Sequence, residues 1–145
     1  MKMNNATIIQ LMNLLQKYKD SKLPQKISYA IGRNLIVFEN EYKFYQNQLN
    51  SVLEKYNDDI LKDENGEMLT KNGIPVVKKE SEQDFYKELN DLLSIDVEVN
   101  LYTVDEESFN YDDNSGRYDV LSPSNVAELS SVLCFEQNVT INDED

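Results

Sequence analysis

Hydrophobic side chains between Leu23 and Tyr56 recur at alternating steps of four and three residues, the spacing that places them on one face of a helix. The row consists of Ile31, Leu35, Phe38, Tyr42, Tyr45, Leu49, Val52 and Tyr56. Within this stretch no proline follows Pro24, and the single glycine is Gly32. The pattern therefore predicts a helix of about 33 residues and roughly 50 Å. The usual helix has about 11 or 12 residues.

A shorter row at the same spacing precedes this helix. It consists of Ile8, Leu11, Met12, Leu15 and Tyr18. Asn4 or Asn5 can accept a hydrogen bond from the first free amide groups, and the pattern ends near Ser21, so a first helix is predicted between them. Because the connection to Pro24 is short, the two helices are expected to pack as an antiparallel hairpin over residues 1–57.

The first helix is too short to cover the whole hydrophobic row of the long helix. About 15 residues cannot cover a row that extends over about 26. The uncovered distal half consists of Tyr42, Tyr45, Leu49, Val52 and Tyr56. Its tyrosines make it amphipathic, which is typical of an interface. This helical interface is predicted to meet either a second copy of the chain, in a homodimer, or the protein's own C-terminal elements.

Two Asn-Gly pairs after the long helix predict tight turns. Asn65-Gly66 and Asn72-Gly73 both consist of residues that tolerate the positive φ of a type I′ turn. Short apolar stretches around them predict one or two β-hairpins, with Pro75 at an edge. The run Ser81-Glu82-Gln83-Asp84 then resembles a capping box and predicts a third helix. The apolar face of that helix contains Phe85, Leu89 and Leu92.

The last regular elements are a strand and a helix. Apolar and polar residues alternate from Ile95 to Leu101, which predicts a strand with one buried face. We expect this strand to pair with the hairpin segments in a small antiparallel sheet. Ser122, followed by Pro123, predicts the start of a fourth helix. The apolar face of this helix consists of Val126, Leu129, Val132 and Leu133.

Together these elements predict an α+β fold. It consists of an antiparallel helical hairpin with one very long helix, a small antiparallel β-sheet of hairpins, and two further short helices. A length of 145 residues suits a single domain over 1–145. The helical hairpin is expected in 1–57, a smaller α+β part in 58–141, and a frayed tail in 142–145.

Charge is distributed unevenly along the chain, whose net charge is −13. Residues 1–57 carry a net charge of +4, residues 58–80 carry −2, and residues 81–145 carry −15. The acidic part can attract the basic part of the same chain, keep the protein in solution, or imitate a polyanion. A basic cluster around the predicted hairpin turn consists of Lys17, Lys19, Lys22, Lys26 and Arg33. With such a net charge, this cluster is expected to be solvated or paired with the chain's own acids, and direct nucleic-acid binding is not expected.

The composition excludes several classes of enzyme. The chain has no histidine, and its one cysteine, Cys134, lies in an apolar run. Neither a zinc site nor a histidine-activated nucleophile can therefore be built within one chain. The four glycines are isolated, which excludes a glycine-rich phosphate loop. We expect no enzymatic activity, no catalytic residues, no metal site and no cofactor.

The sequence predicts no association with a membrane. It contains no apolar run of about 18 residues. It also lacks the basic, apolar and small-residue pattern of a signal peptide at its start. The expected location is the cytoplasm of the cell in which the protein is made.

Residues 105–119 have no clear helix or strand pattern and are named the acidic segment. The carboxylates of this segment are Asp105, Glu106, Glu107, Asp112, Asp113 and Asp119, and its aromatic residues are Phe109, Tyr111 and Tyr118. Large aromatic side chains in a hydrated loop either anchor a partner or fold back onto the protein. We predict that the acidic segment binds a partner.

The run Leu23-Pro24-Gln25-Lys26-Ile27-Ser28-Tyr29-Ala30-Ile31 continues into Gly32-Arg33-Asn34-Leu35 and resembles the signature of a family of small bacteriophage proteins of unknown function. In that family this motif opens a long charged helix after an apolar first helix. A turn rich in Asp, Asn and Gly follows, and then a helix whose counterpart here is Phe85-Tyr86-Lys87-Glu88-Leu89. The order of elements is similar over most of the chain. The resemblance implies a phage protein that acts in the cytoplasm of a host cell, and it implies no catalytic residue.

These observations lead to three hypotheses about function. The first is a phage counter-defence protein, an anti-CRISPR or anti-restriction inhibitor. Its acidic surface would act as a DNA mimic in the nucleic-acid-binding channel of a host nucleic-acid-targeting complex. The alternative is a virion assembly or structural accessory protein that acts through a helical, coiled-coil oligomer. The third is regulation of transcription through the basic cluster.

Overall fold

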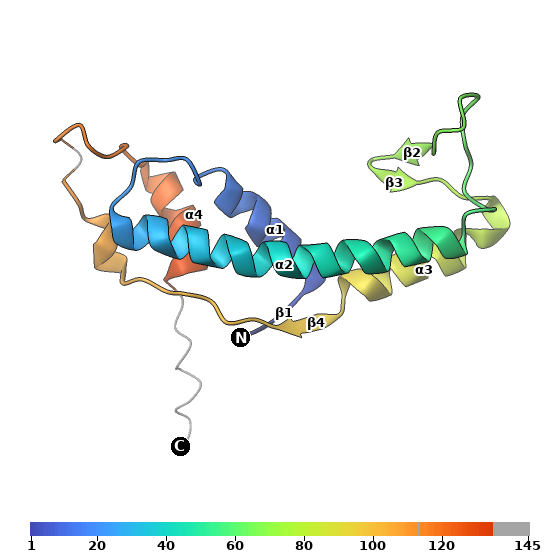
Figure 1. Cartoon of the computed structure of the whole chain (residues 1–145), viewed down its shortest axis with the longest axis horizontal. Coiled ribbons are helices and arrows are strands. Elements are labelled where there is room, and N and C mark those ends of the chain that lie inside the picture. Colours follow the sequence, from blue (N-terminus) through green and yellow to red (C-terminus); the bar gives the residue numbers. More distant parts are fainter. Residues whose placement is uncertain (113, 135–145) are drawn as a thin grey trace, which may run out of the picture. The chain divides into compact units, whose positions relative to one another are not determined.

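The chain combines one long and several short helices with small antiparallel sheets (Figure 1). This structure, a computed structural model, describes residues 1–112 and 114–134. Asp113 and the predicted frayed tail at 142–145 lie outside the described residues. The helices are α1 (Asn5–Gln16), α2 (Gln25–Lys55), α3 (Glu82–Leu93) and α4 (Pro123–Leu133), with the 3-10 helices η1 (Lys79–Ser81) and η2 (Glu106–Phe109). The strands are β1 (Lys2–Asn4), β2 (Thr70–Lys71), β3 (Ile74–Pro75) and β4 (Asp96–Glu98). The predicted α+β class is confirmed.

Helix α2 confirms the long helix that the hydrophobic row predicts. It runs for 31 residues. The Pro24 carbonyl accepts hydrogen bonds from the amides of Ile27 and Ser28, at 3.0 and 3.1 Å. Ser28 Oγ also donates to the Leu23 carbonyl at 3.2 Å. The Leu-Pro step therefore fixes where the helix begins, because its carbonyls are bonded to the first helical turn.

Contacts divide the chain into two compact units. The first unit contains Met1–Tyr42 and the chain from Asp96 onward, and the second contains Lys43–Ile95. Helix α2 contributes its N-terminal part to the first unit and its C-terminal part to the second. Because one continuous helix belongs to both units, this division is not marked by a linker. A single domain over 1–145 stays a prediction.

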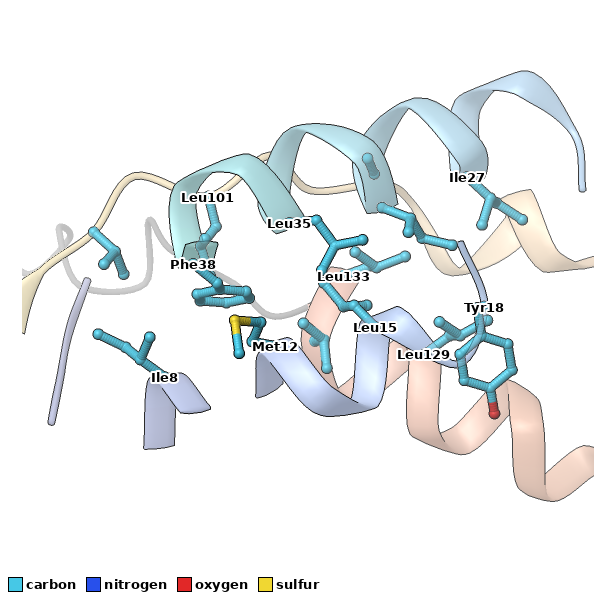
Figure 2. Close-up of a cluster of buried hydrophobic side chains, with 14 of the residues drawn as sticks. Ile8, Met12, Leu15, Tyr18, Ile27, Leu35, Phe38, Leu101, Leu129 and Leu133 are labelled. Carbon is cyan, nitrogen blue, oxygen red and sulfur yellow. The ribbon is translucent and has the colours of Figure 1, made fainter. Parts of the chain in front are cut away.

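The core of the first unit is built mainly from α1, α2 and α4. Figure 2 shows apolar side chains of these helices directed into a shared interior. The fully buried side chains include Ile8, Leu15, Ile27, Phe38, Leu129 and Leu133. Each such side chain contributes about 1.5–3 kcal/mol when it leaves water. The apolar faces predicted for these helices are confirmed, and the antiparallel packing of α1 on α2 stays a prediction.

Helix α1 begins where expected but ends earlier than predicted. Asn4 caps it, since Asn4 Oδ1 accepts a hydrogen bond from the Thr7 amide at 2.9 Å. The helix ends at Gln16. The Tyr18 amide then donates to the Leu15 carbonyl, three residues back, at 3.0 Å. This tighter bond ends the α-helical pattern, so turns occupy the residues predicted as its last turn.

The strand predicted from Ile95 to Leu101 is shorter than expected and has a different partner. Strand β4 pairs antiparallel with β1, with Val97 opposite Met3. The expected pairing with the hairpin segments is therefore wrong, because the N-terminal residues of the same unit supply the neighbouring strand. Ile95 is 51% exposed, whereas Val99 and Leu101 are buried beyond the end of β4. Alternate burial thus continues beyond β4, where the Val99 amide still donates to the Met1 carbonyl at 2.8 Å.

In the second unit, α3 covers the distal part of the hydrophobic row. Val52 and Phe85 are buried together with Ile60 and Val77. Tyr56 packs edge-to-face on Phe85, with ring centroids 5.2 Å apart. The predicted cover was a second copy or the C-terminal elements, and here it comes from α3, which follows α2 in the same chain. A homodimer stays a prediction.

The two Asn-Gly pairs form different turns. Between β2 and β3, Asn72 and Gly73 have φ values of 55° and 79°, which confirms the predicted type I′ turn. In the Asn65-Gly66 pair, the positive φ is confined to the glycine, at 80°. Here Asp63 Oδ1 accepts hydrogen bonds from the amides of Asn65 and Glu67 at 2.8 and 2.9 Å. An Asx turn therefore replaces the predicted type I′ turn.

Three segments of the second unit close on one another in a ring of hydrogen bonds. The Leu61 amide donates to the Val76 carbonyl, the Val76 amide to the Leu69 carbonyl, and the Leu69 amide to the Leu61 carbonyl. Each distance is 2.9 Å. Pro75, which has no amide hydrogen, lies in β3 beside this ring. The ring holds the three segments together although the neighbouring strands β2 and β3 have only two residues each.

The caps of the last two helices differ from each other. Ser81 Oγ donates to Asp59 Oδ2 at 2.9 Å and accepts no hydrogen bond from α3. The predicted capping box at Ser81 is therefore wrong, because this hydroxyl joins the helix to the preceding segment. Ser122 caps α4 as predicted, in a reciprocal pair of hydrogen bonds with Asn125.

Candidate functional site

The acidic segment lies in the first unit and begins with the 3-10 helix η2. Asp105, Glu106, Glu107 and Asp112 are exposed. Among the described residues, none of these four carboxylates lies within 4.0 Å of a lysine, an arginine or the N-terminal ammonium group. Their charge is therefore not neutralised by an ion pair within the described chain. Asp113, the fifth predicted carboxylate, lies outside the described residues.

The aromatic side chains of the segment are turned toward the protein's own core. Phe109 and Tyr111 are half-buried and pack against the apolar cluster of the first unit. Tyr111 also lies edge-on to Tyr118, with ring centroids 5.4 Å apart. Tyr111 Oη donates to the Asp119 carbonyl at 2.6 Å. Of the two roles predicted for these rings, folding back onto the protein accounts for the contacts, and contact with a partner stays a prediction.

Backbone hydrogen bonds hold both ends of the segment. The Val104 amide donates to the Leu133 carbonyl of α4 at 2.8 Å. At the other end, the Asp119 amide donates to the Lys22 carbonyl at 2.7 Å, and the Lys22 amide donates to Asp119 Oδ2 at 2.9 Å. Asp119 is therefore a structural residue that joins the segment to the α1–α2 connection. The carboxylates that remain available are concentrated at the start of the segment.

A hollow of about 430 Å³ separates the start of the acidic segment from the start of α2. Its lining consists of Pro24, Gln25, Lys26, Asp105, Glu107 and Ser108. Lys26 thus faces the same space as Asp105 and Glu107 without an ion pair to either. The hollow brings residues from the start of α2 and from the acidic segment to one surface.

The predicted helical interface is distributed over two environments. Tyr42 packs against the core of the first unit. Tyr45 and Leu49 belong to the second unit and line an apolar hollow of about 340 Å³ with α3 and the β2–β3 hairpin. Val52 is buried, and Tyr56 Oη donates to Glu88 Oε2 at 3.0 Å. The structure therefore does not gather these five residues into one free seam.

Glu88 receives a second partner from the end of α2. Lys55 Nζ lies 2.7 Å from Glu88 Oε1. Hydrogen bonds from Lys55 and Tyr56 lower the pKa of the Glu88 carboxyl below its ordinary value. Burial and the hydrogen bond to Glu88 raise the pKa of Tyr56. This group joins α2 to α3 inside the second unit and has the character of a structural contact.

A similar group joins α4 to the end of α1. Tyr18 Oη donates to Glu128 and accepts from Asn125 Nδ2, at 3.0 Å for the latter. Lys17 Nζ lies 3.0 Å from Glu128 Oε2. Hydrogen bonds from Tyr18 and Lys17 lower the pKa of Glu128, while burial and the bond to Glu128 raise that of Tyr18. One member of the basic cluster is thus paired with the chain's own acid, as expected.

Glu128→Gln is expected to lower the melting temperature near neutral pH and to have little effect in acid. Because the folded pKa of Glu128 is depressed from 4.5, its stabilisation is present above that value. The stabilisation is lost as the pH falls through the folded pKa. Thermal unfolding followed by circular dichroism, at pH values from about 7 to about 3, tests this. Glu64→Gln, an exposed change of equal charge, is the control. An equal temperature difference at both pH extremes would contradict an ionic role.

Two features of the motif at the start of α2 were not predicted as site residues. Asn34 is fully buried, donates from Nδ2 to the Tyr102 carbonyl at 2.9 Å and accepts from the Tyr102 amide at 2.7 Å. Tyr29 and Arg33 lie on the exposed side of the same turns. The sequence did contain a signal for the buried Asn34, because this polar residue lies between Ile31 and Leu35 on the apolar face of the helix.

The described residues contain neither a cluster of metal ligands nor a helix suited to a membrane. In the described ranges, no three His, Cys, Asp or Glu side chains are grouped closely enough to hold a metal ion. Across those same residues, no helix has the length and apolarity that crossing a membrane requires. Cys134 is half-buried, and burial raises the pKa of its thiol, which makes the reactive thiolate less available at neutral pH.

Comparisons with models of protein families, with curated proteins and with solved structures find no match for this chain.

Proposed function

We propose that this protein is a non-enzymatic inhibitor that binds a host nucleic-acid-targeting complex through its acidic segment, as a phage counter-defence protein. The observation that carries the proposal is a set of exposed carboxylates on a segment whose ends are fixed. The set consists of Asp105, Glu106, Glu107 and Asp112. None of them has an ion-pair partner among the described residues. The partner we propose is a basic surface that normally holds nucleic acid.

Fixed ends support this role on energetic grounds. Tyr111, Asp119 and the Val104–Leu133 hydrogen bond hold the described ends of the segment, so binding requires less ordering of those ends. Nucleic-acid-targeting effectors hold their substrate in positively charged channels. Acidic groups presented to such a channel accelerate association and make it sensitive to salt.

The alternative role in virion assembly has less support. It depended on a free distal row along the long helix. Val52 is buried against the protein's own Phe85, and Tyr56 contacts the same ring. Tyr45 and Leu49 remain half-buried beside α3. Because the apolar row has a cover within the chain, we place the acidic segment ahead of a helical oligomer.

Neutralising the start of the acidic segment should abolish inhibition without unfolding the protein. The variant is Asp105→Asn with Glu106→Gln and Glu107→Gln. Exposed charges contribute about 1 kcal/mol or less each, so the melting temperature should change little. Binding to a basic channel should weaken about tenfold or more, since several attractive contacts are lost together. The measurement is phage plating efficiency on hosts that carry a CRISPR or restriction system, with and without the protein.

The matched control removes the same charge elsewhere. Glu64→Gln, Glu67→Gln and Glu80→Gln change three exposed acids of the second unit. This control variant should protect phage to the same extent as the wild-type protein does. Equal protection by both triple variants would remove the acidic segment from the mechanism. Equal loss in both would assign the effect to net charge alone.

A further inference from the structure

One face of α2 is exposed along the part of the helix that belongs to the first unit. It consists of Tyr29, Gly32, Arg33 and Ile36. Tyr102, from the loop between β4 and η2, extends it. We name these five residues the α2 face. Tyr29 is 45% exposed, Ile36 57% and Tyr102 45%. Large apolar side chains gathered on an exposed face are typical of an interaction surface.

The side chains of the α2 face are ordered by contacts with one another. Arg33 donates from a guanidinium nitrogen to Tyr29 Oη at 3.2 Å, and its Cζ lies 5.7 Å from the Tyr29 ring centroid. The rings of Tyr29 and Tyr102 meet edge-on, with centroids 5.0 Å apart. Tyrosine and arginine are enriched among the residues that dominate binding energy. A partner therefore meets an arrangement that is already formed.

Gly32 has no structural reason to be a glycine. A Cβ atom at this position would have no neighbouring heavy atom within 4 Å. Its backbone has no positive φ, unlike Gly66, Gly73 and Gly116. A glycine inside a helix costs about 1 kcal/mol relative to alanine. The fold thus carries a cost at the centre of the α2 face, where a missing side chain lets another backbone approach closely.

The charge of the α2 face identifies the partner's chemistry. Between Gln25 and Phe38, α2 carries Lys26 and Arg33 and no acidic residue. Arg33 also borders a hollow of about 220 Å³, whose lining is mixed: Asn34, Val37, Asn100, Leu101 and Tyr102. An exposed guanidinium group between apolar side chains fits a carboxylate on an otherwise apolar surface, because arginine binds carboxylates with two parallel hydrogen bonds.

We propose that the α2 face binds an amphipathic helix of another protein, which crosses α2 at Gly32. Apolar side chains of that helix lie over Tyr29 and Ile36, and one of its carboxylates meets Arg33. This surface is separate from the carboxylates of the proposed inhibitor function and does not depend on them. It gives the protein a second point of contact on one complex, or a contact with a second partner.

A nucleic acid fits the α2 face less well. Tyr29, Tyr102 and Arg33 can stack on bases, as in single-strand binding surfaces. A nucleic-acid strand, however, carries a charge at every nucleotide. Asp105 and Glu107 line the same hollow as Lys26, the other basic residue in this part of α2, and would repel the phosphates of a strand that reached it. A helix with one carboxylate at Arg33 avoids that repulsion.

Gly32→Ala is expected to stabilise the protein. The fold leaves room for the new methyl group, and alanine favours the helix by about 1 kcal/mol. In a chain of 145 residues this corresponds to a rise in melting temperature of about 2–4 °C. A fall in melting temperature would show that the fold itself requires Gly32, and the argument for a close partner would fail.

The binding test uses a fluorescein-labelled helical peptide of about 18 residues, with leucines on one face and glutamates beside them. Matched peptides replace every glutamate with glutamine or with lysine. A thymidine oligonucleotide of similar length is the nucleic-acid probe. The protein variants are Gly32→Leu and Arg33→Gln, with Gln10→Leu as a control that adds leucine to an exposed position of α1. Fluorescence anisotropy measures binding, and circular dichroism confirms folding.

We expect the acidic peptide to bind, and binding to weaken about tenfold or more in Gly32→Leu and in Arg33→Gln. Gln10→Leu should bind as the wild type does, and the lysine peptide should not bind. Absence of saturable binding up to about 1 mM peptide would overturn the proposal. Equal peptide affinity for the wild type and for both variants would overturn it too. So would tighter binding of the oligonucleotide at the same residues. Self-association in sedimentation that Gly32→Leu removes would instead assign the α2 face to a second copy.

Discussion

Phe85→Ala is expected to lower the free energy of unfolding by about 3–5 kcal/mol. Phe85 is fully buried in the second unit, whose buried apolar cluster otherwise consists of Val52, Ile60 and Val77. Removing the ring leaves a cavity, and it also removes the contacts with Tyr56 and Tyr86. So small a core has few other side chains to close the space.

Thermal and urea unfolding, followed by circular dichroism, measure this loss. For a chain of 145 residues the melting temperature should fall by about 8–15 °C. Phe44→Ala removes the same ring from a side chain that is 63% exposed and should stay within about 0.5 kcal/mol of the wild type. A Phe85→Ala protein that melts as the Phe44→Ala protein does would contradict the proposed core of the second unit.

Asn34→Leu is expected to destabilise the protein by about 2–4 kcal/mol, although leucine suits a buried helical position. The change removes both hydrogen bonds to the Tyr102 backbone. It leaves the partly buried amide and carbonyl of Tyr102 without those partners, and each such group costs about 1–3 kcal/mol where water does not replace the lost hydrogen bond. The loop that carries Tyr102 should then detach from α2.

Hydrogen exchange measured by mass spectrometry distinguishes this local effect from general unfolding. Exchange should rise in the loop that contains Tyr102 more than in α3. Asn40→Leu makes the same substitution at an exposed position of α2 and should leave exchange unchanged. If Asn34→Leu is as stable as Asn40→Leu, the paired hydrogen bonds contribute nothing to the fold.

The helices could be predicted because their evidence is repeated many times along the chain. The row from Ile31 to Tyr56 supplies several independent positions for one spacing, and α2 contains all of them except Tyr56, which directly follows the helix. The cover of its distal half could not be predicted in the same way. Helix α3 has its own apolar face, but the hydrophobic spacing within one helix does not show which other helix packs against it. The row alone was equally compatible with a second copy.

The sequence could not predict which strands pair with each other. Strand β1 has three residues, too few for an alternating pattern, and its partner β4 is far from it in the sequence. Alternation from Ile95 to Leu101 predicted which residues are buried near its end, and it carried no information about the neighbour. Short strands depend on packing around them, so their partners are decided by tertiary structure.

In the acidic segment, too, composition predicted exposure but not specific contacts. The abundance of carboxylates predicted an exposed, charged loop, and Asp105, Glu106 and Glu107 are exposed. Composition could not separate these from Asp119, whose carboxylate accepts a hydrogen bond from the Lys22 amide 97 residues away. Asn34 was missed for a related reason. Its polar side chain interrupts an apolar face, and only the position of Tyr102 explains it.

The hydrogen-bonded ring of Leu61, Leu69 and Val76 also occupies the backbone groups that an added strand would need. Leu61, Met68, Leu69 and Ile74 are 38–46% exposed, and an open ribbon with such side chains would invite strand addition by another chain. At the three ring positions, however, every amide and carbonyl is already bonded within the ring. An approaching strand therefore finds no free backbone group at these three positions, which disfavours strand addition there.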